Sequence, residues 1–303
     1  MRVGMSLTTD YSSYDDVRLA GRHIVERAAA ANRSELDSLF VGDHHVTPRP
    51  YFQNIPLMGR LLAEWGDKPA GCLFLLPLWH PVLLAEQVGT LAALAKGRFI
   101  IQCGIGTGRS QFAGMGASLR TRPSAFEEAL DICRRLWAGE AVSSDGRFVI
   151  ENARISPSPP QRVHVWMACS IAGMDRAARL GDGWVGMPST TVDGARKEIE
   201  TYLEHCARYG RAPTAVALRR DIFVAGTEAE ATDVLEEAVA GGYRGIAREA
   251  LVTGTIDQVA DRFAELAAVG ATDILCRHLI TDQTKVLASL ERLAEVRQKI
   301  AAV

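Results

Sequence analysis

The stretch TIDQVADRFAELAAVGATDILCR, residues 255–277, contains the repeating unit that decides the fold. Thr255 and Gln258 have the spacing of a capping box, which satisfies unpaired backbone donors at the start of a helix. Apolar residues then recur on one helical face, namely Ile256, Val259, Ala260, Phe263, Leu266 and Ala267. Gly270 follows at a C-cap position, and the apolar run 274–276 is typical of a buried parallel strand. We therefore predict a helix that packs on a sheet and leads into the next strand.

The same alternation of short apolar runs and longer helical stretches continues through the chain. The predicted strands are 2–7, 38–42, 71–76, 98–104, 163–168, 183–187, 215–224 and 272–277. Eight strands, each followed by a helix, favour a single (β/α)8 TIM barrel domain over residues 1–303, and an open doubly wound sheet is the alternative. We expect insertions after strand 2 (46–56) and strand 4 (105–120), and a hairpin insertion before strand 5 (141–162).

Composition excludes several classes of protein. The 303 residues contain 34 Lys+Arg against 36 Asp+Glu, so no basic field is available for nucleic acid. Six cysteines without zinc-finger spacing indicate buried thiols in a reducing cytoplasm. We expect no signal peptide, membrane span or metal site.

Polar residues directly after strand 2 are the first candidates for chemistry. His44 and His45 follow an apolar strand, at the end where a barrel builds its active site. Either histidine can act as a general base or hydrogen-bond donor, or be satisfied by loop backbone. Arg277 ends strand 8, where it can face the barrel mouth or pair with a structural carboxylate.

Two further segments have features of ligand-binding loops. The glycine-rich run after strand 4, with Gly104 and Gly106, fits neither a dinucleotide fingerprint nor a P-loop, but lets backbone approach a flat ligand. Ser170 is a candidate N-cap whose following amides can bind phosphate, although serine also caps ordinary helices.

Several motifs, taken together, resemble the luciferase-like flavin- and F420-dependent oxidoreductases, which include bacterial luciferase. They are Gly42-Asp43-His44-His45, residues 76–87 (LPLWHPVLLAEQ), 90–91, 96–99 (KGRF), Gly104-Ile105-Gly106, Arg122 with 126–130 (FEEAL), 181–184 (GDGW) and 254–262 (GTIDQVADR). In order and spacing these motifs cover nearly the whole chain.

The resemblance implies a metal-free barrel with a reduced flavin or F420 in its mouth, and it implies roles for individual residues. His44 corresponds to the catalytic histidine beside the ring. The other implied cofactor-binding residues are Met5, Cys72 and Leu73 (often joined by a cis peptide in the family), Gly104, Gly106, and the phosphate-binding Ser170, Ile171, Ala172 and Gly173. We further expect Tyr51, Phe52, Phe112 and Arg277 to contact substrate.

The chain also departs from the family pattern after strand 4. F420-dependent sugar-phosphate dehydrogenases carry a glutamate just after the strand-4 glycines, and the luciferase branch carries an arginine near the position of Ile105. Here the sequence reads Thr107-Gly108-Arg109-Ser110. Neither light emission nor sugar-phosphate oxidation is therefore the expected reaction.

The resemblance leaves three functions open. The first is a two-component monooxygenase that uses reduced FMN, delivered by a separate NAD(P)H:flavin reductase, and O2 to oxygenate a small organic substrate. The alternative is F420-dependent hydride transfer on the same fold, and the third is a non-catalytic flavin-binding barrel. The family resemblance also implies a homodimer.

Overall fold

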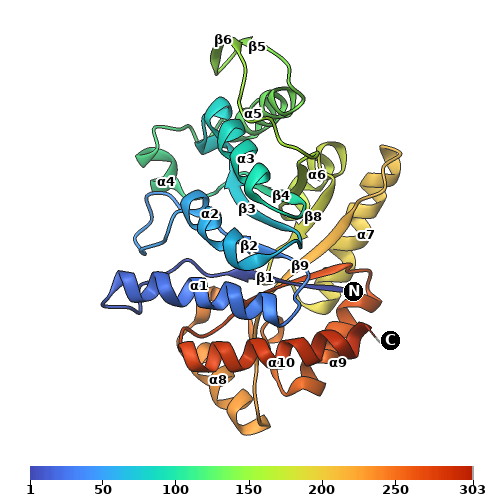
Figure 1. Ribbon diagram of the computed structural model, residues 1–303. Coiled ribbons are helices and arrows are strands. Elements are labelled where there is room, and N and C mark those ends of the chain that lie inside the picture. The colour runs from blue at the N-terminus through green and yellow to red at the C-terminus, as the bar shows by residue number, and fades with distance from the viewer. Residues whose placement is uncertain (302–303) are drawn as a thin grey trace. The chain divides into compact units, whose positions relative to one another are not determined.

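The computed structural model describes residues 1–301 (Figure 1), and the hydrogen-bonded order of its parallel strands is that of a (β/α)8 barrel. Eight strands run in the cyclic order β1 (Arg2–Leu7), β2 (Leu39–Val41), β3 (Ala70–Leu75), β4 (Phe99–Gly104), β7 (His164–Ala168), β8 (Gly183–Gly186), β9 (Ala215–Val224) and β11 (Asp273–His278). Strand β11 returns to β1 in parallel register. The predicted fold class is therefore confirmed, and each strand lies within two residues of its predicted bounds.

Three further strands lie outside this order. Strands β5 (Val142–Asp145) and β6 (Val149–Ala153) form the antiparallel hairpin expected before the fifth barrel strand. The short strand β10 (Val252–Gly254), which pairs with the end of β9, was not predicted. Its sequence, Val252-Thr253-Gly254, contains no apolar run that would mark a buried strand.

Helices connect the strands. The α-helices are α1 (Val17–Arg33), α2 (Asn54–Trp65), α3 (Pro81–Leu94), α4 (Arg109–Gly114), α5 (Arg122–Trp137), α6 (Met174–Leu180), α7 (Val192–Arg208), α8 (Glu228–Ala240), α9 (Ile256–Ala268) and α10 (Gln283–Ala301). The 3₁₀ turns are η1 (Leu76–Leu78), η2 (Ile171–Gly173), η3 (Tyr243–Gly245) and η4 (Arg248–Ala250). None of the helices among residues 1–301 is long and apolar enough to cross a membrane.

The chain divides into two compact units. Unit 1 contains residues 1–8, 13–40 and 166–303, and unit 2 contains residues 9–12 and 41–165. The extent of a single domain over the whole chain stays a prediction, and we describe each unit separately.

In unit 1, residues 255–277 fold as the sequence predicts. Helix α9 begins with the capping box of Thr255 and Gln258, and Gly270 adopts a positive φ of 104° where the chain turns into β11. Val259, Phe263 and Leu266 of α9 are buried, as the helical periodicity predicts. This burial of one apolar stripe is what stabilises a surface helix against a sheet.

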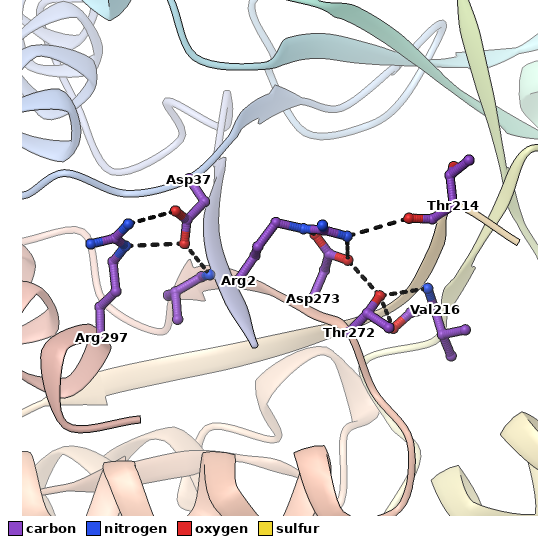
Figure 2. Close-up of polar contacts among 8 residues, drawn as sticks. Arg2, Asp37, Thr214, Val216, Thr272, Asp273 and Arg297 are labelled. Atoms are coloured by element: carbon purple, nitrogen blue, oxygen red, sulfur yellow. Dashed lines mark hydrogen bonds and ion pairs between the residues drawn. The ribbon is translucent and has the colours of Figure 1, made fainter. Parts of the chain in front are cut away.

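A polar network in unit 1 ties together the amino-terminal ends of its strands (Figure 2). Arg2 donates two hydrogen bonds of 2.7 Å to the Asp273 carboxylate, which also accepts from Thr272 Oγ1. Asp37 accepts from Arg297 and from the backbone N–H of Val3. In barrels this end of the sheet serves stability, whereas the opposite end carries function.

Unit 2 has its own buried core around β3 and β4, which pair in parallel from Ala70↔Phe99 to Leu75↔Gly104. Trp65, at the end of α2, is fully buried and donates from Nε1 to the Pro69 carbonyl. Gly97 lies where the chain enters β4, and a Cβ there would meet the Asp67 carbonyl oxygen at 2.2 Å. Only glycine therefore fits at this close approach of two backbone segments.

Candidate functional site

A fully buried carboxylate organises the end of β2 in unit 2. Asp43 Oδ2 accepts hydrogen bonds of 2.8 Å from the Leu75 backbone N–H and from Trp79 Nε1. His45 Nε2 lies 2.9 Å from Asp43 Oδ1, although the two groups are not aligned as a hydrogen bond. Asp43 thus connects the end of β2 to the end of β3 and to Trp79, which precedes α3. Removing the two donors of this buried carboxylate would cost folding free energy, because the charge would then be neither hydrogen-bonded nor solvated.

His44, the predicted catalytic residue, is partly exposed beside this network. Its ring stacks on Tyr51 with the centroids 3.7 Å apart and the planes 14° from parallel. A Cβ on Gly42 would lie 2.9 Å from His44 Nε2, so a side chain at position 42 would collide with the ring. Gln53 Nε2 donates to the His44 carbonyl and fixes the backbone. Two of the predicted site residues, His44 and Tyr51, are therefore in contact.

The backbone just after these histidines is strained. Val46 has a φ of 46°, a left-handed conformation that is a genuine outlier for a β-branched residue. A Cβ on Gly114, in α4, would meet Val46 Cγ1 at 2.5 Å, so the two loops that follow β2 and β4 touch here. Strain of this kind persists only where the surroundings hold it, and it concentrates at functional sites.

The predicted aromatic substrate contacts of unit 2 differ in their surroundings. Phe52 is partly exposed and its ring lies 4.7 Å from that of Tyr11. Phe112, in α4, is 1% exposed and fills the space next to Gly106, where a Cβ would meet its Cε2 at 2.8 Å. Gly106 also has a φ of 71°. Both the contact with Phe112 and this left-handed backbone conformation therefore require glycine at position 106. Contact of Phe52 and Phe112 with substrate stays a prediction.

One face of the β3–β4 strand pair combines apolar side chains with a single unpaired donor, which suits the binding of a flat ligand. Leu73 is in register with Gln102, and Leu75 with Gly104, so these four residues share one side of the strand pair. Leu73 and Leu75 are partly exposed, and Gly104 places no side chain above them. Gln102 Nε2 is buried and has no hydrogen-bond partner within residues 1–301. An unpaired buried donor beside an apolar floor suits a heteroaromatic ring that carries acceptor atoms.

Cys72 occupies the opposite side of β3. It is fully buried, its Sγ lies 4.0 Å from the Asn54 carbonyl oxygen at the start of α2, and burial raises the pKa of its thiol. Among residues 1–301 the cis peptide bond is Ser156–Pro157, so the expectation of a cis bond between Cys72 and Leu73 is wrong. A trans bond is the lower-energy form for any non-proline residue.

In unit 1, the predicted site residues lie on β1, β11 and the segment after β7. Met5 is fully buried and in register with Cys276, on the side of the sheet where His278 contacts Ser289 of α10. Its side chain therefore lies on the helix-covered side of the sheet, and its contact with a cofactor stays a prediction. Arg277, on the other side of β11, donates from Nη2 to Thr8 Oγ1 at 3.1 Å.

The segment expected to bind phosphate forms a short exposed turn. Ser170 stands at the N-cap of η2 with its hydroxyl not engaged in capping, and Ile171, Ala172 and Gly173 form the turn that leads into α6. Ile171 is 55% exposed despite its apolar side chain. Burial raises the pKa of the preceding Cys169 to about 12, so that thiol stays protonated at neutral pH.

Several candidate functional residues could not be predicted from the sequence. Asp43 and Trp79 stood within recognised motifs, but nothing in the sequence indicated that they bond to each other across 36 residues. Gln102 lies in a strand whose sequence is typical of a buried strand. The one feature that could have marked it as a candidate ligand-binding residue is its polar amide within the apolar run Phe99–Gly104. Strain at Val46 has no sequence signal at all.

The family can now be identified. A family profile described as luciferase-like monooxygenase matches residues 1–250. The chain belongs to this family. The prediction of a luciferase-like oxidoreductase is thus confirmed at the level of the family.

Curated relatives of this luciferase-like chain share one description. The F420-dependent glucose-6-phosphate dehydrogenase of Kribbella flavida is 28% identical over 240 residues, which cover 70% of this chain and 72% of that protein. Seven further dehydrogenases of the same name are 26% to 31% identical, and the chain spans only 52% to 57% of their length.

Solved structures include both cofactor types. The oxygenating constituent of 3,6-diketocamphane monooxygenase from Pseudomonas putida, in complex with FMN, has a TM-score of 0.82 at 19% identity and covers 99% of each chain. An F420-dependent secondary alcohol dehydrogenase in complex with an F420–acetone adduct has a TM-score of 0.80 at 17% identity, again with 99% coverage of each chain. At this level of identity the two structures establish the luciferase-like fold and no more.

Proposed function

We propose that the protein is an F420-dependent oxidoreductase that transfers hydride between the deazaflavin and a small organic substrate other than glucose 6-phosphate. The observation that carries this proposal is the description shared by the sequence relatives, eight of which are F420-dependent. The FMN-containing proteins resemble the chain in fold only.

The residues of unit 2 fit a deazaflavin ring. Leu73 and Leu75 offer an apolar face, Gly104 leaves room above it, and the unpaired Gln102 Nε2 offers one donor. Gln102 would hold a ring carbonyl or nitrogen, and the two leucines would contact the ring plane. When bound, F420 supplies a carbon that accepts or donates a hydride. Phosphate binding by the turn from Ser170 to Gly173 in unit 1 stays a separate prediction from the sequence.

His44 is the residue that moves the proton in this proposal. Hydride transfer to or from an alcohol carbon requires that a proton leave or reach the oxygen, and an imidazole does this near neutral pH. Tyr51 fixes the ring plane by stacking, and Gly42 leaves space for Nε2. Asp43 holds the backbone in place through Leu75 and Trp79, so the imidazole needs little reorganisation during the reaction.

We expect a substrate other than the sugar phosphate of the relatives. Arg109 stands in the loop where the F420 sugar-phosphate dehydrogenases carry a glutamate, and it is exposed at the start of α4. An exchange of a carboxylate for a guanidinium reverses the local charge and removes a proton carrier. A different substrate is therefore expected.

A two-component monooxygenase that uses reduced FMN and O2 is the second candidate. It is favoured by the description of the matched family profile, which covers residues 1–250. This candidate requires a separate NAD(P)H:flavin reductase as partner. A homodimer and a cytoplasmic location stay predictions under either candidate.

Anaerobic turnover distinguishes the two candidates. With F420 and a panel of small alcohols, or reduced F420 and the matching ketones, we expect absorbance changes of the deazaflavin without any oxygen. His44→Ala should lower kcat at least about tenfold, as loss of a general acid–base group does. The matched control is His80→Gln, which changes an exposed histidine of unit 2. Oxygenated product from reduced FMN and O2, with no F420 turnover, would refute the proposal.

A further inference from the structure

The loops that follow β1 and β2 pair with each other in unit 2. The backbone N–H of Tyr11 donates to the Pro50 carbonyl at 3.1 Å, and the N–H of Phe52 donates to the Thr9 carbonyl at 2.9 Å. The rings of Tyr11 and Phe52 also meet, with their centroids 4.7 Å apart. We call these two paired segments, residues 9–11 and 50–52, the strap.

The strap carries the tyrosine ring that lies against His44. Asp10 and Tyr51 are opposite each other in the strap and form an isolated antiparallel bridge. The two backbone hydrogen bonds flank this pair, so it is a non-hydrogen-bonded pair, at which the two segments approach most closely. The Tyr51 ring stacks on the His44 imidazole with the centroids 3.7 Å apart and the planes 14° from parallel. The pairing of the two loops therefore decides where this ring lies.

The chain between the histidines and the strap has few free backbone dihedral angles. Pro48 and Pro50 each have a φ that is fixed by the pyrrolidine ring. Val46 is held in a left-handed conformation with a φ of 46°. Arg49 lies beside the strap, with its Nη1 3.5 Å from Asp10 Oδ2. A stiff loop gives up little conformational entropy when its tyrosine is held on the imidazole, which favours the stack.

An imidazole that transfers protons must be held in a defined orientation. His44 is partly exposed and lies in a loop, beyond the end of β2 at Val41. A side chain in such a place samples several rotamers unless packing holds it. A displacement of about 1 Å in an active site can lower a rate about 100-fold. The stack with Tyr51 supplies such packing, and the strap holds Tyr51 in place.

We propose that Tyr11 is a positioning residue of the active site, which acts on the His44 imidazole through Tyr51. The backbone N–H and the ring of Tyr11 join the two segments of the strap, and the strap places Tyr51 against the imidazole. The loop after β1 thus controls the orientation of a proton carrier at the end of β2. The catalytic consequence rests on the proposed oxidoreductase function, whereas the effect on the orientation of His44 does not.

Proton NMR of the full chain without cofactor, with selective labelling of histidine, tests the orientation of His44. A ring stacked at 3.7 Å shifts the signals of its neighbour upfield, and the loss of signals in His44→Gln identifies those of His44. We expect Tyr51→Leu to lose most of this upfield shift and Tyr51→Phe to keep it. Tyr11→Pro removes the N–H that bonds to Pro50, so its His44 signals should move toward those of Tyr51→Leu. Tyr11→Ala keeps that N–H and should cause a smaller change.

A double variant tests whether Tyr11 acts through Tyr51. In a chain that already carries Tyr51→Leu, Tyr11→Pro should cause no further change in the His44 signals, because the two residues act in one series of contacts. A further change as large as that in the natural chain would overturn the proposal, and so would unchanged His44 signals in the single variant Tyr11→Pro. The control is Glu140→Gln, which removes an exposed ion pair with Arg135 of α5 and should leave the His44 signals in place.

Turnover with F420 and the substrate found in the anaerobic panel tests the catalytic consequence. Tyr11→Pro should lower kcat at least about tenfold with a smaller change in KM, because it displaces a proton carrier. Tyr51→Phe should recover most of the activity that Tyr51→Leu loses, and Glu140→Gln should turn over like the natural chain. An unchanged kcat in Tyr11→Pro, with its His44 signals displaced, would overturn the positioning role.

Two further outcomes are provided for. Should Tyr11→Pro fail to fold, Tyr11→Gly takes its place in both measurements, because it removes the ring and loosens the backbone. The expected NMR shifts without any turnover of F420 would refute the proposed function and leave the orientation of His44 by Tyr11 standing.

Discussion

His278 in β11 makes the stability of unit 1 depend on pH. Its side chain is buried, and its Nε2 lies 3.0 Å from the hydroxyl of Ser289 in α10. The same hydroxyl accepts from the Val224 backbone N–H, so the imidazole belongs to a small buried network. Burial, and secondarily the positive charge of Arg27, lowers the pKa of His278 from 6.5 to about 3.

The sign and size of the effect follow from this shift. Because the folded pKa lies below the unfolded one, the unfolded chain binds more protons as the pH falls from 6.5 toward 3. The stabilisation is therefore complete above pH 6.5 and is lost progressively below it. Each pKa unit corresponds to about 1.4 kcal/mol, so His278 alone should remove about 2 kcal/mol of unfolding free energy between pH 7 and pH 5.

Urea denaturation at pH 7, 6 and 5 measures this loss. The perturbation is His278→Gln, which removes the titrating group and keeps a polar atom within reach of Ser289. We expect the unfolding free energy of the natural chain to fall by about 2 kcal/mol more than that of the variant over this interval. His80→Gln, at an exposed position, should follow the natural chain. Parallel pH profiles of the natural chain and His278→Gln would refute the reasoning.

Four further predictions concern other parts of the chain. Asp43→Asn should lower the unfolding free energy by about 1–3 kcal/mol in urea denaturation, because two buried donors lose a charged acceptor, and unchanged stability would contradict its organising role. Gly97→Ala should lower thermal stability by about 1–3 kcal/mol by overpacking against a backbone carbonyl, whereas Gly59→Ala, where a Cβ would lie 3.8 Å from Leu91 Cδ2, should show no such loss in the same melts. Asp273→Asn should destabilise the amino-terminal network without changing cofactor affinity, and a change in affinity would assign it to the site. Ser170→Ala should weaken FMN more than riboflavin in binding titrations, and equal losses would remove the phosphate assignment.

Local signals in the sequence were sufficient for the fold. The capping box of α9 and the apolar pattern of the barrel strands each depend on residues a few positions apart. The local structure can therefore be predicted from neighbouring residues. The start of α8 shows the limit of such rules. Thr227 and Glu230 have the spacing of a capping box, and Thr227 Oγ1 accepts from the Glu230 N–H, but the Glu230 carboxylate accepts from the Gly226 N–H and not from that of Thr227.

The site was only partly predictable, because its interactions join residues far apart in the chain. His44 and Gly106 could be placed by their positions at strand ends. The contacts of Asp43 with Trp79, and of Asp221 with Arg244, depend on which strands are neighbours and which side chains share a face. The strand that carries Met5 was predicted correctly, whereas the side of the sheet on which its side chain lies follows only from the register with β11, and its contact with a cofactor stays a prediction.

Parallel anaerobic titrations with F420 and FMN test the central claim most directly. We expect F420 to bind saturably, FMN to bind at least about tenfold more weakly, and Gln102→Leu to weaken F420 by a similar factor, because the unpaired buried donor loses its role. Binding of FMN in preference to F420 would contradict the account, and failure of both cofactors to bind would contradict it as well.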